Sequence, residues 1–461
     1  MNGSYLFRHL FLFTGIFPLL SCFSDIKAVK KAEDNYNNYC MGCHGPAKEK
    51  FVNKEWIYGK EHEEVFYSVK YGREEMGMPS FEAAFSDDEI DAMVNYLLEK
   101  NNDNDKILTS DKMIISSEVQ NFYVDTVISG LSVVWGMTWL PDGNMLITER
   151  SGTLYRFANN ELITIEGLPP VFVFGQGGLL DIELHPNYEN TGWIYITYSK
   201  PAINPDKDGG NTALIRAKLD GNKLTNIEEL YAGHPATRRG QHFGSRIEFD
   251  RNGYLYFTIG ERGHKENAQL LGNSNGKLHR INDDGSVPID NPFYNVEGAD
   301  KTIYNFGHRN QQGLAMHPES GEIWSHEHGP RGGDEINIEK RGANYGWPEI
   351  TFGINYNGTI ITEDTAKAGM EQPVIYYDPS IAPSGMDFVE GTNYPNWKGN
   401  ILIGSLRFRH LVRVVLNNDK VIHQEKLIED IGRVRDVKMG PDNLIYVSVE
   451  GIGVLRLVPV D

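Results

Sequence analysis

The stretch from Leu140 to Arg150, LPDGNMLITER, decides the fold because its pattern returns five more times along the chain. Each copy starts with a turn rich in Pro, Asp, Asn or Gly and continues as an alternating strand of Ile, Tyr, Val and Leu, which is typical of a β-hairpin. The other copies are HPNYENTGWIYITYS from His185, FDRNGYLYFTIGERG from Phe249, HPESGEIWSHEHG from His317, YPNWKGNILIGSL from Tyr394 and GPDNLIYVSVEG from Gly440.

Six copies of one hairpin unit predict an all-β six-bladed β-propeller, with a pair of β-sandwiches as the alternative. The 300 residues from Pro141 to Pro441 contain five intervals, with an average of 60 residues each. Because this exceeds the usual length of a blade, we expect long loops between the strands. In propellers, functional loops gather around one end of the central channel.

The composition narrows the classes of partner. The chain has 461 residues, with 40% apolar and 11% aromatic residues, which suits a globular protein of more than one domain. Its 44 Lys and Arg against 63 Asp and Glu give a formal net charge of −19. A nucleic acid is therefore an unfavourable partner, whereas a neutral or cationic substrate or a basic protein fits better.

The first 22 residues predict an export signal, because Arg8 precedes an apolar run that is too short to cross a membrane. The run ends in Leu-Leu-Ser-Cys at Cys22, which resembles the lipobox of bacterial lipoproteins; an ordinary secretory signal is the alternative. We therefore expect an exported protein of the periplasm or cell envelope, with a lipid on Cys22 as its membrane anchor.

The segment CMGCH has the spacing of c-type haem attachment. Cys40 and Cys43 would bind the two vinyl groups of the haem, and His44 would ligate the iron. A zinc site would normally need further Cys or His ligands, and the chain has no other cysteine to offer beyond Cys22. A redox dithiol is the remaining alternative.

The second axial ligand of the haem is expected from YGREEMGMPSF, where Met78 precedes Pro79 and Met76 is the fallback. This arrangement resembles the axial Met of class I cytochromes c. A thioether ligand raises the potential of a haem, which suits an electron acceptor.

A Ser-x-x-Glu capping box at Ser86 and Glu89 then predicts the last helix of a small all-α domain. Its apolar side chains repeat at helical spacing, and the polar stretch EKNNDNDK follows. The predicted organisation is a signal peptide (1–22), a cytochrome c domain (23–102), a linker (103–122) and the propeller (123–461).

The propeller region from about residue 125 onward resembles the PQQ-dependent soluble glucose and aldose sugar dehydrogenases. The resemblance rests on GQGGLLDIELHP, HFGSRIEFD, FTIGERG, FGHRNQQGLA, EHGPRGGDEIN, GANYGWP, APSGMDF and GRVRDV, in that order. It implies oxidation of an aldose at C1 to an aldonolactone, by hydride transfer to PQQ.

The resemblance also implies roles for individual residues. His242 matches the general base that takes the proton of the anomeric hydroxyl, and Glu261 matches the acidic residue that orients this base. Arg309 matches a residue at the quinone edge of PQQ, where a guanidinium stabilises developing negative charge. The further residues implied for the cofactor pocket are Gln176, Asn310, Ser380, Arg407, Arg433 and Arg435, with Arg407 standing where the glucose enzymes have Lys.

Two calcium sites are implied in the same way. The backbone carbonyls of Gly329 and Pro330 match donors to the Ca²⁺ that bridges protein and PQQ. Glu335 and the carbonyl of Tyr345 resemble a second, structural calcium site.

Two features indicate the aldose sugar dehydrogenase branch. His328 stands where the glucose enzymes have Gln, and the segment from Pro348 to Pro379 is short where they carry long insertions. A shorter rim predicts a more open pocket and a broader range of substrates.

A cytochrome ahead of such a propeller is expected to be an electron outlet, because sugar oxidation releases two electrons together and a haem accepts one. A further acceptor, another cytochrome or a respiratory chain, would drain the haem. The alternatives are a propeller that binds carbohydrate or a partner without catalysis, and a propeller hydrolase of the lactonase kind.

Overall fold

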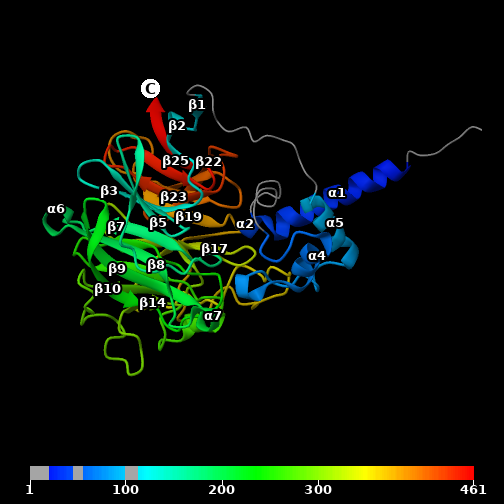
Figure 1. The fold of residues 1–461 in the computed structure, drawn as a ribbon, viewed down its shortest axis with the longest axis horizontal. Coiled ribbons are helices and arrows are strands. Elements are labelled where there is room, and N and C mark those ends of the chain that lie inside the picture. Colours follow the sequence, from blue (N-terminus) through cyan, green and yellow to red (C-terminus); the bar gives the residue numbers. More distant parts are fainter. Residues whose placement is uncertain (1–19, 45–55, 99–112, 461) are drawn as a thin grey trace, which may run out of the picture.

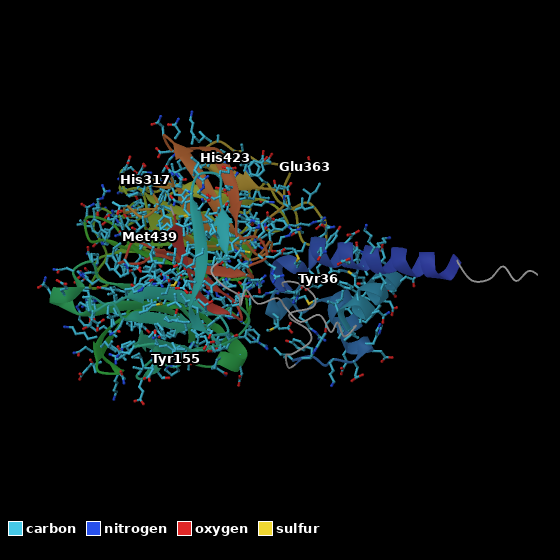
Figure 2. All side chains as sticks on the ribbon, turned by 90° about the horizontal axis from the view of Figure 1, so that it is seen from above. Tyr36, Tyr155, His317, Glu363, His423 and Met439 are labelled. Carbon is cyan, nitrogen blue, oxygen red and sulfur yellow. The ribbon has the colours of Figure 1, made fainter. Side chains whose placement is uncertain are left out.

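The computed structural model describes residues 20–44, 56–98 and 113–460. Over these residues the chain forms a small helical domain and an all-β six-bladed propeller, which confirms the predicted fold class (Figure 1). The view from above agrees, with Tyr36 in the helical domain beside the propeller and with Tyr155 and His317 on the propeller (Figure 2).

The helical domain closes around one apolar cluster, in which Ile90, Met93 and Val94 are completely or almost completely buried. The predicted capping box is confirmed: the backbone N–H of Ser86 donates to the Glu89 carboxylate at 2.9 Å, and the N–H of Glu89 donates to the Ser86 hydroxyl at 3.4 Å. The helices of this domain are α1 (Leu20–Tyr39), α2 (Met41–His44), α4 (His62–Tyr71), the 3-10 helix η1 (Glu74–Met76) and α5 (Asp87–Leu98).

The predicted signal peptide lies outside the described residues, apart from the first turn of α1 at Leu20. Nothing is described of the Cys22 side chain, so its lipidation stays a prediction. None of the helices in the described part of the chain is both long enough and apolar enough to span a membrane.

Six antiparallel sheets form the blades, each with its innermost strand at the central channel. Apolar side chains of neighbouring blades pack between the sheets, as Leu146 and Leu154 of one blade do with Ile182 and Ile196 of the next. Five of the blades have four strands each, and their strands are given below in chain order.

These blades are β3 (Val134–Trp139), β4 (Met145–Glu149), β5 (Thr153–Ala158) and β6 (Glu161–Ile165); β7 (Leu179–Leu184), β8 (Trp193–Pro201), β9 (Gly210–Asp220) and β10 (Lys223–Ala232); β11 (Ile247–Phe249), β12 (Leu255–Ile259), β13 (Lys277–Ile281) and β14 (Ile303–Phe306); β15 (Gln311–Met316), β16 (Ile323–Glu327), β17 (Asp334–Ile338) and β18 (Ile375–Tyr377); β19 (Pro383–Phe388), β20 (Ile401–Ser405), β21 (Leu411–Asn417) and β22 (Lys420–Leu427). Three short helices lie in the connections: α6 (Tyr188–Thr191), α7 (Pro205–Asp208) and the 3-10 helix η2 (Lys265–Gln269).

The sixth blade has five strands and joins the two ends of the propeller. The C-terminal strands β23 (Val434–Met439), β24 (Ile445–Val449) and β25 (Gly453–Val460) are completed by β2 (Asn121–Ser129) and β1 (Ile114–Ser116). Strand β2 pairs with β25 from Asn121 opposite Val460 to Ser129 opposite Gly453. This pairing closes the ring and covers the edge of the last C-terminal strand.

The closing blade corrects the predicted linker at residues 103–122. Residues 103–112 of that segment lie outside the described residues, but the chain already forms strand β1 at Ile114 and enters β2 at Asn121. The prediction was wrong here because these strands stand outside the six repeats and their partner lies at the far end of the chain.

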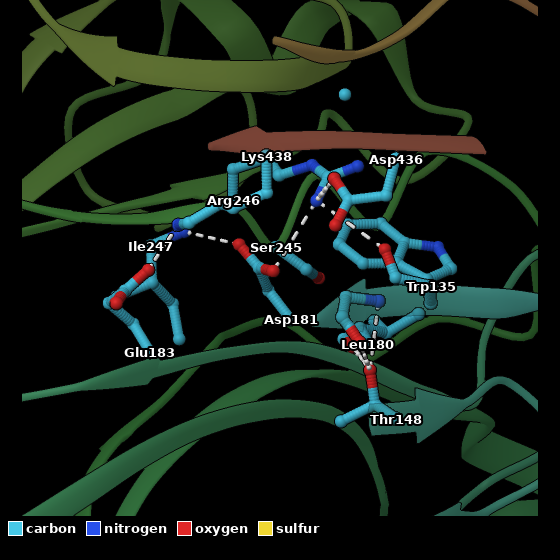
Figure 3. A network of polar contacts seen from close by, with 12 residues as sticks. Trp135, Thr148, Leu180, Asp181, Glu183, Ser245, Arg246, Ile247, Asp436 and Lys438 are labelled. Atoms are coloured by element: carbon cyan, nitrogen blue, oxygen red, sulfur yellow. Dashed lines mark hydrogen bonds and ion pairs between the residues drawn. The ribbon is translucent and has the colours of Figure 1, made fainter. Parts of the chain in front are cut away.

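A buried charged network fills the central channel (Figure 3). The Arg246 guanidinium donates to Asp436 at 2.7 Å and to Asp181 at 3.3 Å, and it lies 4.2 Å from the ring centroid of Trp135. These four side chains come from four different blades. Arg246 therefore ties the blades together directly below the pocket described next.

Candidate active site

A polar pocket opens at the end of the channel where the innermost strands begin. Because neighbouring strands are antiparallel, the loops that enter these strands gather at this end, and the six repeated turns lie at the opposite end. The repeated turns therefore lie away from the pocket, which is formed by the loops that enter the innermost strands and by the residues at the far ends of the repeats, such as Arg150, His328 and Glu450. From the propeller, its walls include Trp135, Arg150, Gln176, His242, Arg309, Asn310, His328, Ser380, Arg407, Arg433, Arg435 and Glu450.

His242, which lines this pocket, forms a close pair with the buried Glu261. The Nδ1 atom of His242 contacts a carboxylate oxygen of Glu261, which leaves Nε2 as the ring nitrogen that can take up a proton. The backbone of His242 has a left-handed φ of 59°, and its N–H donates to the side-chain oxygen of Gln176 at 2.8 Å. The Gln176 side chain therefore holds the backbone of His242 in its left-handed conformation.

The charges around this pair favour a neutral imidazole. Burial lowers the pKa of His242 and the neighbouring Arg309 lowers it further, while Glu261 acts in the opposite direction; the net pKa is below its usual value. Burial alone would raise the pKa of Glu261, but the charges of His242 and Arg309 outweigh it, so its pKa is also lowered. The pair can therefore accept a proton at neutral pH.

Arg309 and Asn310 are held by a buried carboxylate that sequence reasoning missed. The backbone N–H groups of both residues donate to one oxygen of Glu327, at 2.6 Å and 3.4 Å. The Arg309 guanidinium then donates to the carbonyl oxygen of Gly329 at 2.9 Å, while the Asn310 side chain accepts from the N–H of Gly244 at 3.1 Å.

His308, to which the sequence assigns no role, supports the same segment. Its ring is fully buried, with Nδ1 at 2.8 Å from Glu327 and Nε2 at 3.0 Å from the Asn305 side chain. Burial would lower its pKa, but Glu339 and Glu327 raise it to about 10. The resulting imidazolium fixes Glu327, and the only signal in the sequence is the position of His308 next to Arg309.

The floor of the pocket carries an excess of positive charge. Arg433, which immediately precedes β23, and Arg435 within it both reach Glu450, with distances of 2.7 Å and 3.1 Å from their Nε atoms. Burial lowers the pKa of Arg435 to about 10. Sequence reasoning missed Arg150, which also lines the pocket and donates to the carbonyl of Gly175 at 2.9 Å.

Arg407 and Ser380 lie at the other side of the pocket. Arg407 donates to the carbonyl of Ser380 at 3.1 Å, and its buried Nε has no hydrogen-bond partner. The Ser380 hydroxyl contacts both carboxylate oxygens of Asp334, at 2.8 Å and 2.7 Å. Asp334 also accepts from the N–H of Gly329, so it links this wall to the loop beside Arg309.

The pocket fits a ligand with several carboxylates. Six arginines line the pocket, whereas Glu450 is the acidic residue among its lining side chains, and burial lowers the pKa values of Arg150, Arg407 and Arg435. Planar guanidinium groups bind carboxylates with two hydrogen bonds. The three carboxylates of PQQ therefore match the residues present.

The predicted calcium residues are not gathered into one cluster of acidic side chains. Gly329 and Pro330 line the pocket, although the carbonyl of Gly329 already accepts from Arg309. The Glu335 side chain accepts from Asn337 at 3.2 Å, and burial raises its pKa to about 8. Among the residues that the structure describes, no group of three or more His, Cys, Asp and Glu side chains is placed to hold a metal ion.

The predicted haem ligands lie on the side of the helical domain near the pocket. Cys40, which immediately precedes α2, lies one turn from His44 at its end, with the N–H of His44 donating to the carbonyl of Cys40 at 2.9 Å. Met78 packs against the apolar cluster of this domain. The Cys43 side chain lies outside the description. One helical turn followed by a partly buried thioether fits a c-type haem.

The helical domain covers the mouth of the pocket, contrary to the expectation of an open rim. Asn38, Tyr39 and Gly77 line the same pocket as His242. From the short segment at 348–379, Tyr356 packs against the apolar cluster of the helical domain. The prediction considered the propeller alone, whereas the helical domain also contributes to the walls of this pocket.

The fold and site together define a propeller oxidoreductase joined to a c-type cytochrome domain. This chain belongs to the glucose/sorbosone dehydrogenase family, which it matches over residues 131–456. Residues 27–97 match the family described as cytochrome c oxidase, cbb3-type, subunit III. Both matches agree with the resemblances found in the sequence.

Individual relatives support this placement. The aldose sugar dehydrogenase of Escherichia coli (strain K12) is 40% identical over 71% of this chain and 90% of its own length. The crystal structure of the soluble aldose sugar dehydrogenase from Escherichia coli in the apo form is 38% identical, with a TM-score of 0.70 over 74% of this chain and all of that one. The PQQ-bound aldose sugar dehydrogenase from Streptomyces coelicolor is 26% identical, with a TM-score of 0.62 over 74% of this chain and 98% of that one.

Proposed function

We propose that this protein oxidises aldose sugars at C1 to aldonolactones with PQQ as its cofactor, and that the electrons pass singly to haem c in its own N-terminal domain. The observation that carries the proposal is the His242–Glu261 pair, which faces an arginine-lined pocket at the channel end of the propeller. The relatives named as aldose sugar dehydrogenases point to the same class of substrate.

Each side chain of the site has a separate role in the proposed oxidation of the sugar. The Nε2 atom of His242 takes the proton of the C1 hydroxyl, and Glu261 fixes the tautomer and stabilises the imidazolium that results. When PQQ is bound, it supplies a quinone that accepts two electrons as a hydride and gives them up one at a time. Arg407, Arg433 and Arg435 would hold its carboxylates, and Arg309 with Asn310 would lie against its quinone edge.

The contribution of the haem domain to the pocket wall supports its proposed role as the electron outlet. Tyr39, which lines the pocket, immediately precedes Cys40, and Gly77, which also lines it, immediately precedes Met78. Both haem-binding segments therefore approach the cofactor pocket directly. A covalently joined acceptor also remains at a high effective concentration.

The proposal also includes two bound Ca²⁺ ions and a location at the cell envelope. We expect Ca²⁺ at PQQ near the carbonyls of Gly329 and Pro330, and a structural Ca²⁺ near Glu335 and the carbonyl of Tyr345. Export and a lipid on Cys22 would bring the protein to a membrane, where another cytochrome or a respiratory chain would drain the haem.

Two other functions are less well supported. A lactonase-type propeller would hold a metal at the centre of the channel with carboxylate and Asn ligands. Here the Arg246 guanidinium lies between Asp181 and Asp436 at that place (Figure 3). A propeller that only binds carbohydrate would not require a histidine–carboxylate pair beside a cluster of buried arginines.

The test of the proposal is sugar-dependent reduction of the haem in the purified full chain, followed by its absorption bands after addition of PQQ, Ca²⁺ and a panel of aldoses. His242→Ala should lower the rate by a factor of about 100 or more because the base is lost. His423→Ala, which removes a histidine from the propeller surface, should match the unaltered protein. A failure of PQQ to bind, or full activity in His242→Ala, would contradict the proposal.

A further inference from the structure

The outer wall of the pocket is supplied by the haem domain, and no role has yet been given to it. Asn38 and Tyr39 at the end of α1 reach the cavity that contains His242, and Gly77 reaches it after η1. Gly77 lies so close to Gln241, the neighbour of His242, that a Cβ atom added to it would lie 3.2 Å from the Cβ of Gln241.

Several contacts hold this wall against the propeller. The N–H of Gly240 donates to the carbonyl of Glu75 at 2.7 Å, and the Arg239 guanidinium donates to the carbonyl of Glu74 at 2.8 Å. On the other side of the pocket, Arg407 reaches the carbonyl of Asn37 at 3.5 Å. The two segments of the haem domain are thus fixed at separate points of the rim.

The Tyr39 ring is held from both domains. Within the haem domain it meets Phe85 edge to face, with 4.8 Å between ring centroids. From the propeller, the guanidinium of Arg331 lies 3.9 Å from the Tyr39 ring centroid. Arg331 is itself tied to Ile354 by a backbone hydrogen bond of 2.9 Å from its N–H. A ring fixed in this way presents a rigid surface to the pocket.

We propose that Asn38 and Tyr39 form part of the sugar-binding site, so that the haem domain restricts the dehydrogenase to small sugars. This inference rests on the proposed function. An aromatic ring matches the C–H face of a pyranose, and a side-chain amide can both donate to and accept from sugar hydroxyls. Because Tyr39 lines the same cavity as His242, a second sugar unit linked to the oxidised one would meet its ring.

The experiment compares a monosaccharide with a reducing disaccharide, glucose and maltose, in the full chain loaded with PQQ and Ca²⁺. A soluble dye that takes electrons from the cofactor site keeps haem reduction out of the measurement. Tyr39→Ala should raise KM for glucose. It should also raise the ratio of kcat/KM for maltose to kcat/KM for glucose by about tenfold, which is typical when one contact that limits the size of the substrate is lost. The kcat for glucose should stay within about twofold, since His242 and Glu261 are untouched.

Two further variants keep the test decisive. Asn38 is exposed, so Asn38→Ala is expected to fold even if Tyr39→Ala does not, and it should raise KM for glucose by a few fold through loss of one hydrogen-bonding group. Tyr71→Ala is the matched control: its ring is 45% exposed on the same domain and does not line the pocket, so both sugars should behave as with the unaltered chain.

An engineered disulfide tests whether the haem domain lies against the propeller at the pocket, and it does not depend on enzyme turnover. Gly77→Cys with Gln241→Cys should cross-link on mild oxidation after a shift of a few tenths of an ångström, because the Cβ separation of 3.2 Å is slightly shorter than in natural disulfides and Gly77 has a φ of 82°. Gly77→Cys with Asn252→Cys, at the opposite end of the propeller, should not. Formation of the first cross-link without the second would support the position of the wall. A maltose-to-glucose ratio in Tyr39→Ala and Asn38→Ala equal to that of Tyr71→Ala would overturn the inference alone. An unaltered chain that oxidises neither sugar would overturn the proposed function together with it.

Discussion

The basicity of His242 depends on charges that act in opposite directions. Burial and Arg309 lower its pKa, whereas Glu261 raises it by favouring the imidazolium. A base must be neutral to accept a proton, so kcat/KM should fall as the pH drops through the pKa of His242 in the free enzyme. Since this pKa is below its usual value, activity should persist under mildly acidic conditions.

Glu261→Gln tests this balance. The substitution removes the negative charge that raises the pKa of His242, so the acidic limb of the kcat/KM profile should move to lower pH. The imidazolium formed in the reaction also loses its partner, and kcat should fall by a factor of about 10 to 100 or more. The measurement is a pH profile of dye-linked glucose oxidation.

Glu319→Gln, on an exposed turn at the other end of the propeller, is the matched control and should leave the profile unchanged. If the acidic limb in Glu261→Gln stayed in place or moved to higher pH, Glu261 would not be the group that sets the basicity of His242.

At this scale the sequence predicts the catalytic residues only through a family resemblance. His242 and Glu261 are 19 residues apart, on either side of two strands, and no short motif unites them. Arg150 and His308 escaped prediction for the same reason, because their places in the site depend on neighbouring loops and on buried carboxylates. Cys40 and His44 differ, since one helical turn is enough to bring them together.

Among the elements, innermost strands of different blades are coupled by Arg246. Its guanidinium is almost completely buried and bridges Asp181 of β7 and Asp436 of β23. Arg246→Met should destabilise the propeller by about 3 kcal/mol or more, because it leaves two buried carboxylates without their cation. Thermal unfolding of the full chain would measure this as a lower Tm.

Arg251→Met serves as its control, because this arginine is exposed and bonds only to carbonyls of a surface turn. Its effect should stay within about 0.5 kcal/mol. Equal Tm values for the two variants would mean that the channel network does not stabilise the ring.

The elements themselves were largely predictable from the sequence, with one instructive exception. Each of the six repeats contains a turn and an alternating strand, and local propensity agrees with the final blade. Strands β1 and β2 have no such repeat, and their pairing with β25 is specified by the closure of the ring rather than by local sequence.

For the whole molecule, the relative position of the two domains was beyond sequence reasoning. Periodicity and motifs define each domain separately, whereas the interface depends on scattered single contacts such as Arg331 on Tyr39 and Tyr356 against the helical domain. The consequence is functional, since the pocket that holds His242 has walls from both domains.

The ion pair between Glu74 and Arg239 provides a way to adjust this docking without touching the pocket. Arg239 bonds to the carboxylate of Glu74 at 3.2 Å and does not line the cavity. Arg239→Glu would place two carboxylates at the interface and weaken docking. Haem reduction by sugar, followed by stopped-flow at low salt, should become slower by about two- to fivefold, since an exposed pair contributes about 1 kcal/mol or less.

Reversal of both charges distinguishes docking from damage to the site. In the double variant Glu74→Arg with Arg239→Glu the ion pair is restored with opposite polarity, so haem reduction should recover most of its rate. Dye-linked kcat at saturating glucose should be the same in all these variants, because the catalytic pair is unaltered. Added salt should reduce the difference between the single variant and the unaltered chain, since it screens exposed charges. A double variant as slow as Arg239→Glu alone would show that the loss of rate does not come from the charges of this pair, and would contradict the prediction.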